Sequence, residues 1–161
     1  MKTIRYAAAL AVAASAFAAA DASAQTATQV VSYEVTAINE ISVSGSPSLV
    51  INDATPGTGL TSATAGGTYA ITTNETNRKV TAHINSNMPS GVTLKVELAA
   101  PTGGTSTGAV SLSTVAADVV TGVSNVNESG LSISYELSAT VAAGVVASGN
   151  KTVTYTITAG A

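Results

Sequence analysis

Apolar and polar residues alternate with a period of two along most of the chain, which is the pattern of strands with one buried face. In residues 92–98, four aliphatic residues alternate with Thr93, Lys95 and Glu97. We expect Val96 and Leu137 at the centre of the core and the side chain of Glu97 in water. The strands that this alternation predicts are residues 30–37, 41–43, 49–51, 69–73, 80–84, 92–98, 109–113, 119–126, 131–139 and 151–158.

Segments rich in Gly, Pro, Asn and Ser separate the predicted strands at short intervals, as turns do. These segments are residues 45–47, 56–59, 66–67, 88–91, 101–104 and 148–150. Many short strands joined by such turns predict an all-β fold: a single-domain antiparallel β-sandwich of the immunoglobulin-like, Greek-key type, formed by residues 25–161. One stretch, residues 114–120, also suits a short helical turn.

A seven-residue pattern occurs three times, at residues 31–37, 133–139 and 153–159. Each copy reads aliphatic, hydroxyl, Tyr, variable, aliphatic, hydroxyl, Ala, and the alternation places Tyr33, Tyr135 and Tyr155 on the apolar side of their strands. The composition of any half-buried strand can produce this likeness. Alternatively, the first copy can occupy the same kind of position as the last. We expect residues 25–37 to pair within their own chain, and the alternative is exchange between copies, which would build a filament.

Residues 1–24 have the features of a cleavable secretory signal peptide. Lys2 and Arg5 precede an alanine-rich apolar run over residues 6–20, and Ala-Ser-Ala at residues 22–24 fits a signal peptidase site. The run is shorter than the ~20 apolar residues that a membrane-spanning helix needs. We therefore expect cleavage after Ala24, export to the cell surface, periplasm or medium, and no membrane insertion of the mature protein.

The charge of the chain argues against one class of partner, nucleic acids. Removal of residues 1–24, which carry one net positive charge, changes the formal net charge from −3 to −4, and Arg78 and Lys79 form the only adjacent basic pair. Nucleic-acid binding requires clustered basic side chains, so we expect no nucleic-acid partner.

The sequence contains no cysteine. The fold must therefore be held by core burial and hydrogen bonds, without disulfides.

We expect no catalytic residue, no cofactor and no metal. His83 is the only histidine, and the alternation places it on the polar face of its strand with Thr81 and Asn85. A Ser-His-Asp triad is defined by geometry and not by inventory, and we expect no serine in a Gly-x-Ser-x-Gly elbow.

The carboxylates are dispersed along the sequence, whereas calcium loops concentrate them at alternate positions. We expect Asn52 and Asp53 to form an Asx turn. The weaker alternative is that their side-chain oxygens bind calcium at a weak site. Glu34 and Glu136 hold equivalent positions in two copies of the repeated pattern, but a glycosidase would need them facing across a cleft. We do not expect that arrangement.

Three segments, residues 69–74, 88–94 and 151–157, carry a resemblance to exported bacterial surface β-sandwich proteins. More distantly, the chain resembles WxL-type cell-surface domains and fimbrial or spore-coat subunits, which also end in a strand of alternating Thr and aliphatic residues. It lacks the WxL tryptophan and the cysteine pair of pilus subunits. The resemblance implies a non-enzymatic surface or structural protein, a coat or filament subunit whose partners are further copies of itself or other surface components. An adhesive or ligand-binding module is the alternative, and a secreted hydrolase is the least favoured.

Overall fold

The computed structural model describes residues 25–161. The predicted signal peptide, residues 1–24, lies outside the described residues. The chain divides into two units, Met1–Glu34 and Val35–Ala161. In the first unit, residues 25–34 form no helix or strand and are exposed. The second unit holds every strand of the described part of the chain.

The second unit is built from β-strands, and the described residues contain no α-helix. One 3₁₀ turn, η1, covers Val141–Ala143. The strands are β1 (Asn39–Ser44), β2 (Ala54–Thr55), β3 (Gly59–Leu60), β4 (Ala63–Thr73), β5 (Arg78–Ile84), β6 (Val92–Leu98), β7 (Thr105–Ser106), β8 (Val110–Ser111), β9 (Ala117–Val123), β10 (Val126–Ala139) and β11 (Val153–Ala159).

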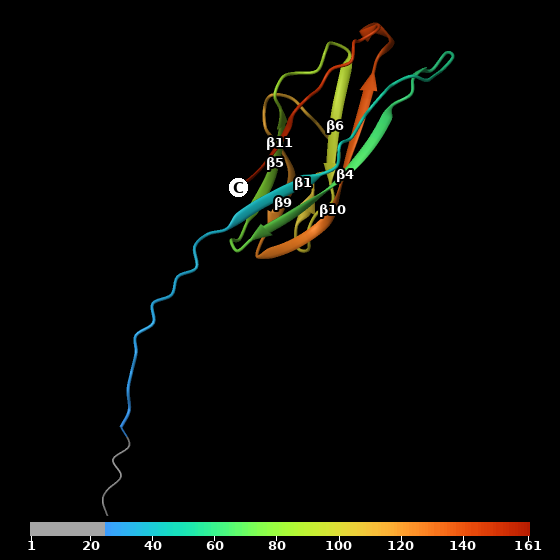
Figure 1. The fold of residues 1–161 in the computed structure, drawn as a ribbon. Helices are drawn as coiled ribbons and strands as arrows, with labels where there is room; N and C mark the ends of the chain where they lie inside the picture. Colours follow the sequence, from blue (N-terminus) through green and yellow to red (C-terminus); the bar gives the residue numbers. More distant parts are fainter. Residues whose placement is uncertain (1–24) are drawn as a thin grey trace, which may run out of the picture. The chain divides into compact units, whose positions relative to one another are not determined.

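The strands form three antiparallel sheets, which confirms the predicted all-β class (Figure 1). A five-stranded sheet has the order β1-β4-β10-β6-β8, and a four-stranded sheet has the order β11-β5-β9-β7. The short strands β2 and β3 pair with each other alone. β4 and β5 follow one another in sequence but belong to different sheets, so residues 74–77 cross from one sheet to the other; we call these residues the arch.

One hydrophobic cluster draws on both larger sheets. The inward residues of the alternating strands fill it, and Val96 of β6 and Val120 of β9 are almost wholly buried. Each such side chain contributes roughly 1.5–3 kcal/mol when it leaves water. The predicted burial of Val96 is confirmed, but that of Leu137 is wrong because Leu137 is half-buried. It lies near the end of β10, opposite Ala63, the first residue of β4, where the sheet stops covering it.

Several predicted strands have different limits in the structure. β6 coincides with the predicted residues 92–98, whereas residues 119–126 divide between two strands. The chain turns at Asn125, whose φ of 46° is left-handed, and Val126 begins β10 in the five-stranded sheet. Residues 114–120 form no helical turn, because Ala117 already begins β9. Residues 49–51 form no strand either, although Leu49 packs against the core.

β1 lies along β4 from Asn39, opposite Thr73, to Ser44, opposite Thr68. The chain then leaves the sheet at a close approach to Gly67. A Cβ atom on Gly67 would lie 2.6 Å from the carbonyl oxygen of Ser44, which is closer than real Cβ atoms come to backbone. Glycine at position 67 therefore permits the end of β1 to lie against β4.

Candidate functional site

The N-terminal segment, residues 25–38, exposes large apolar side chains. Val30 is 93% exposed, Tyr33 is 94% exposed and Val35 is 80% exposed. The predicted strand over residues 30–37 is therefore wrong for the single chain, as is the expectation that Tyr33 lies on the buried, apolar side of a strand. The pairing expected within the chain is not found among the described residues. The same seven-residue pattern forms paired strands in β10 and β11.

The N-terminal segment lacks the two residues that most strongly favour a tight turn. From Gln25 to Ser44 the sequence has neither glycine nor proline. These two residues supply the special φ values of tight turns. A chain of this composition suits one extended run into β1, and 14 extended residues reach at most about 50 Å.

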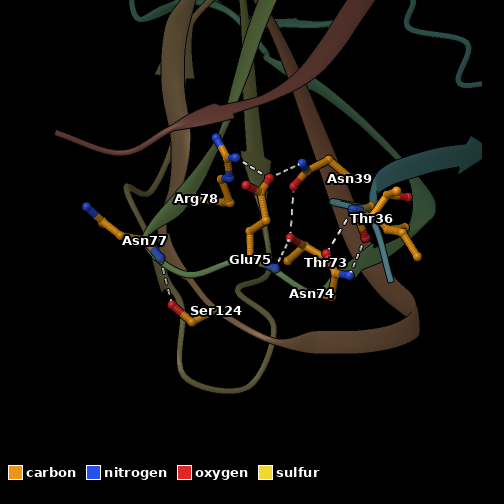
Figure 2. A network of polar contacts seen from close by, with 9 residues as sticks. Thr36, Asn39, Thr73, Asn74, Glu75, Asn77, Arg78 and Ser124 are labelled. Atoms are coloured by element: carbon orange, nitrogen blue, oxygen red, sulfur yellow. Dashed lines mark hydrogen bonds and ion pairs between the residues drawn. The ribbon is translucent and has the colours of Figure 1, made fainter. Parts of the chain in front are cut away.

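The root of the N-terminal segment is held by Asn74 of the arch (Figure 2). The backbone N–H of Ile38 donates to Asn74 Oδ1 at 2.8 Å, and Asn74 Nδ2 donates to the carbonyl oxygen of Thr36 at 2.8 Å. The backbone N–H of Asn74 also donates to the carbonyl oxygen of Ile38, at 3.3 Å. Asn74 thus fixes the direction in which the chain enters β1.

A charged group joins this anchor to β5. Glu75 accepts hydrogen bonds from Asn39 Nδ2 and from the guanidinium of Arg78, with which it forms an ion pair. Thr73 Oγ1 donates to Asn39 Oδ1 at 2.8 Å and accepts from the Glu75 N–H at 3.1 Å. The hydrogen bond from Asn39, followed by the one from Arg78, holds the pKa of the Glu75 carboxyl below its usual range. We call Asn39, Thr73, Asn74, Glu75 and Arg78 the clamp (Figure 2).

The C-terminus lies at the same end of the second unit. The backbone N–H of Gly160 donates to the carbonyl oxygen of Asn77 at 2.7 Å, and Asn77 Nδ2 donates to the carbonyl oxygen of Ala161 at 3.2 Å. Asn77 belongs to the arch, and its own N–H donates to Ser124 Oγ at 2.9 Å (Figure 2). β1 therefore begins and β11 ends beside the arch, and the two strands run in opposite directions.

The four outer strands of the two larger sheets differ in how well their edges are protected. β7 and β8 have only two residues each, and such short edges resist pairing with other chains. β1 has six residues and carries Glu40. β11 has seven residues without a charge or a proline, and its pairing with β5 is free of bulges. Natural edge strands are normally protected from pairing with other chains because they are very short or carry a charged residue, a proline or a bulge.

The apolar face of β11 is incompletely covered. Its inward residues Val153, Tyr155 and Ile157 pack against the core but stay half-exposed. The facing strand β1 adds Ile41, also half-exposed. By contrast, the inward residues of β9, near the other side of its sheet, are fully buried. The core is thus open along β1 and β11.

His83 of β5 is half-buried and lies opposite Thr154 of β11. The predicted wet face of β5 is wrong at Thr81. This residue is buried next to a register shift in the pairing of β5 with β9, between Val80 and Thr81, where the regular alternation of faces is interrupted. Glu136 lies 4.0 Å from Lys95 of β6 in a surface ion pair, and Asp53 Oδ1 accepts the N–H of Ala54 at 2.8 Å. Within residues 25–161, no three His, Cys, Asp or Glu side chains gather as a metal site.

The sequence does contain one serine in a Gly-x-Ser-x-Gly pattern, contrary to expectation. Residues 104–108 read Gly-Thr-Ser-Thr-Gly and do match the letters of a nucleophile elbow. That motif places its serine on a sharp turn from a strand into a helix. Here Ser106 ends the edge strand β7, no helix follows, and its hydroxyl accepts the N–H of Gly108 at 3.2 Å. The match lacks the local structure that an elbow requires.

A surface depression beside the clamp has a volume of about 310 Å³. Its lining contains hydroxyl, amide and aliphatic side chains and no titratable group: Ile38, Thr72, Thr73, Asn74, Asn125, Val126 and Asn127. It therefore offers no acid, base or charged ligand for catalysis.

Comparisons with protein-family models, curated proteins and solved structures give no match. Among residues 25–161, no helix is long and apolar enough to cross a membrane.

Sequence reasoning did not identify the clamp. The polar run over residues 74–77 between two alternating segments signals a turn, and that signal was available. The contacts of Asn74 and Glu75 with residues 36–39 depend on how the strands pair, across more than 30 positions of sequence. A turn signal carries no information about such partners.

Proposed function

We propose that this protein is an exported structural subunit of a bacterial surface coat or filament, folded as a β-sandwich with Greek-key connections, which assembles through β-strand contacts between copies. The observation that carries the proposal is the N-terminal segment: a strand-forming sequence with an exposed apolar face and no partner strand among the described residues. The alanine-rich residues 1–24, with their signal peptidase pattern, support export.

Burial of the segment in a second copy is energetically reasonable. Removing Val31, Tyr33 and Val35 from water contributes roughly 1.5–3 kcal/mol for each aliphatic side chain, and pairing adds main-chain hydrogen bonds. Association has an entropy cost of about 4–15 kcal/mol, so several such residues are needed together. A sparsely charged surface offers little repulsion between copies, since charged residues make up 9% of the chain.

The test is to compare the mature chain with a form that lacks residues 25–37, by light scattering after size-exclusion chromatography and by electron microscopy. We expect the mature chain to form oligomers or filaments and the truncated form to stay monomeric. A synthetic peptide of residues 25–37 should bind the truncated form and raise its melting temperature. If the mature chain remains monomeric and the peptide does not bind, the proposal is wrong.

Matched variants of full length test whether assembly depends on the apolar side chains of the segment or only on its backbone. Val31→Ser, Tyr33→Ser and Val35→Ser together should abolish assembly, because they remove the apolar side chains and keep the backbone. Ser32→Ala with Glu34→Gln changes the other face and should leave assembly intact. Equal assembly by both variants would contradict a role for the apolar face.

The adhesive module expected as an alternative has no comparable observation in its favour. A ligand-binding loop formed by the turn-rich residues 101–108 would contain β7, which pairs with β9. A hydrolase has less support, because Ser106 lies on this edge strand and not on an elbow. Ligand binding by a mature chain that stays monomeric would favour the adhesive module.

A further inference from the structure

We infer that the N-terminal segment of one copy pairs antiparallel with the outer edge of β11 in the next copy, with Tyr33 opposite Tyr155. This inference rests on the proposed function and names the surface that receives the segment. Of the four outer strands, β7 and β8 are too short to bind a segment of seven or more residues, and β1 carries a charge. β11 is long, uncharged and regular.

The free backbone groups of β11 can be assigned from its pairing with β5. The carbonyl of Thr152 accepts the N–H of Asn85 at 3.1 Å, and the N–H of Gly160 donates to Asn77 at 2.7 Å. In an antiparallel ladder, hydrogen-bonded and non-hydrogen-bonded pairs alternate along the strand. The even-numbered residues of β11 therefore bond to β5. The N–H and C=O groups of Val153, Tyr155 and Ile157 point to the outer edge, where an added strand would meet them.

The direction of pairing follows from the chain path beside the arch. β1 begins there and β11 ends there. We propose that in the assembly the N-terminal segment continues the line of β1 backwards, beyond the arch. In a row of copies with one orientation, this segment runs antiparallel to β11 of the next copy. Antiparallel pairing is slightly more stable per residue than parallel pairing. Such a contact is head-to-tail, and it builds a filament when the rotation between copies does not close a ring.

The register follows from the repeated pattern. With Tyr33 opposite Tyr155, Val31 lies opposite Ile157 and Val35 opposite Val153, so each of these three residues of the segment meets an inward, half-exposed residue of β11. A shift by one residue would turn the apolar side chains of the segment to water. The chosen register also covers the open side of the core.

Pairing of the segment with β11 of its own copy is disfavoured. To reach that strand, the segment would have to reverse direction beside residues 36–38, where Asn74 holds the backbone. No glycine or proline lies between Gln25 and Ser44 to form the turn. A reversed segment would also run parallel to β11. The partner is therefore a second copy of this chain.

Cysteine pairs test the register, because the natural sequence contains no cysteine. In the proposed pairing, Ser32 lies opposite Thr156 in a non-hydrogen-bonded pair, with Cα atoms about 4.5 Å apart, within the range of a disulfide. Both residues are exposed in the single chain. The mature Ser32→Cys chain is mixed with a tagged Thr156→Cys chain under mild oxidation. We expect a covalent dimer that contains one chain of each kind, seen on non-reducing gels.

Two controls use exposed positions. Thr152→Cys directly precedes β11, and the register places its Cα roughly 13 Å from that of residue 32, so the mixed dimer should be lost. Ser111→Cys lies on the edge strand β8 and should also give none. The reduced variants should keep the melting temperature of the parent, which shows that they fold.

The outcomes separate the inference from the proposed function. If the chains assemble but Ser32→Cys joins Thr152→Cys or Ser111→Cys and not Thr156→Cys, the acceptor strand or register is wrong and the proposed function stands. If the double variant Ser32→Cys, Thr156→Cys closes a disulfide within one monomer, the segment pairs with its own chain and the inference is wrong. If no variant and no parent chain assembles, both fail.

Discussion

The hydroxyl groups of Tyr135 and Tyr155 lie 2.7 Å apart, and their hydrogen bond joins β10 of the five-stranded sheet to β11 of the four-stranded sheet. Tyr135 is buried and Tyr155 is half-buried. Burial, followed by the hydrogen bond with Tyr135, raises the pKa of Tyr155 above its ordinary range. β11 is thus tied at its third residue, Tyr155, to the opposite sheet, while its outer edge has no partner among the described residues.

This pair should show strong coupling in a double-mutant cycle. Tyr135→Phe or Tyr155→Phe alone leaves one hydroxyl without its partner, which costs about 1–3 kcal/mol of unfolding free energy. The double variant removes both hydroxyls and should cost no more than one single variant. Urea unfolding of the four proteins measures the coupling, and strictly additive losses would show that the hydrogen bond does not stabilise the fold.

Adjacent residues of β6 should differ sharply in their effect on stability. Leu98 is 0% exposed, so Leu98→Ala should lower the unfolding free energy by about 2–5 kcal/mol. Glu97 is exposed on the other face, and Glu97→Ala should cost about 0.5 kcal/mol or less. Denaturant midpoints of the two variants check this, and similar losses would mean that the two faces of β6 are assigned incorrectly.

Glu75 should make the clamp sensitive to acid. The pKa of its carboxyl is lowered in the folded chain, so its contribution is present above the unfolded pKa, near 4.3, and is lost as the pH falls through the folded pKa. Glu75→Gln should therefore lower the melting temperature at pH 7 and have a smaller effect in strong acid. Thermal melts of both proteins across this range measure the difference.

The conservative control for this prediction is Glu40→Gln. Glu40 belongs to β1 close to the clamp but is exposed, and it takes no part in the hydrogen bonds of the clamp. Its melting temperature should follow that of the parent at every pH. If Glu75→Gln and Glu40→Gln behave alike, the clamp does not depend on the charge of Glu75.

The sequence was sufficient to predict the all-β class and the limits of β6, because a strand with one wet face alternates regardless of its neighbours. The same reasoning misplaced residues 30–37. Their alternation indicates a segment able to pair, but it does not say whether the partner strand belongs to the same chain. The helical turn predicted for residues 114–120 is wrong for a related reason. Ala116 and Ala117 suit a helical turn, but the pairing of β9 with β5 makes Ala117 part of a strand.

The unbroken run from Gln25 to Ser44 has a mechanical consequence. If the N-terminal segment is pulled in a filament, the force passes straight into β1 along its axis. The hydrogen bonds between β1 and β4 lie perpendicular to that axis, so the six paired positions from Asn39 to Ser44 would be sheared together and not unzipped one at a time. The hydrogen bonds of Asn74 to the backbone of Thr36 and Ile38, which precede Asn39, would be the first to bear the force. Pulling single chains from the N-terminus should therefore give one abrupt rupture, and Asn74→Ala should lower its force.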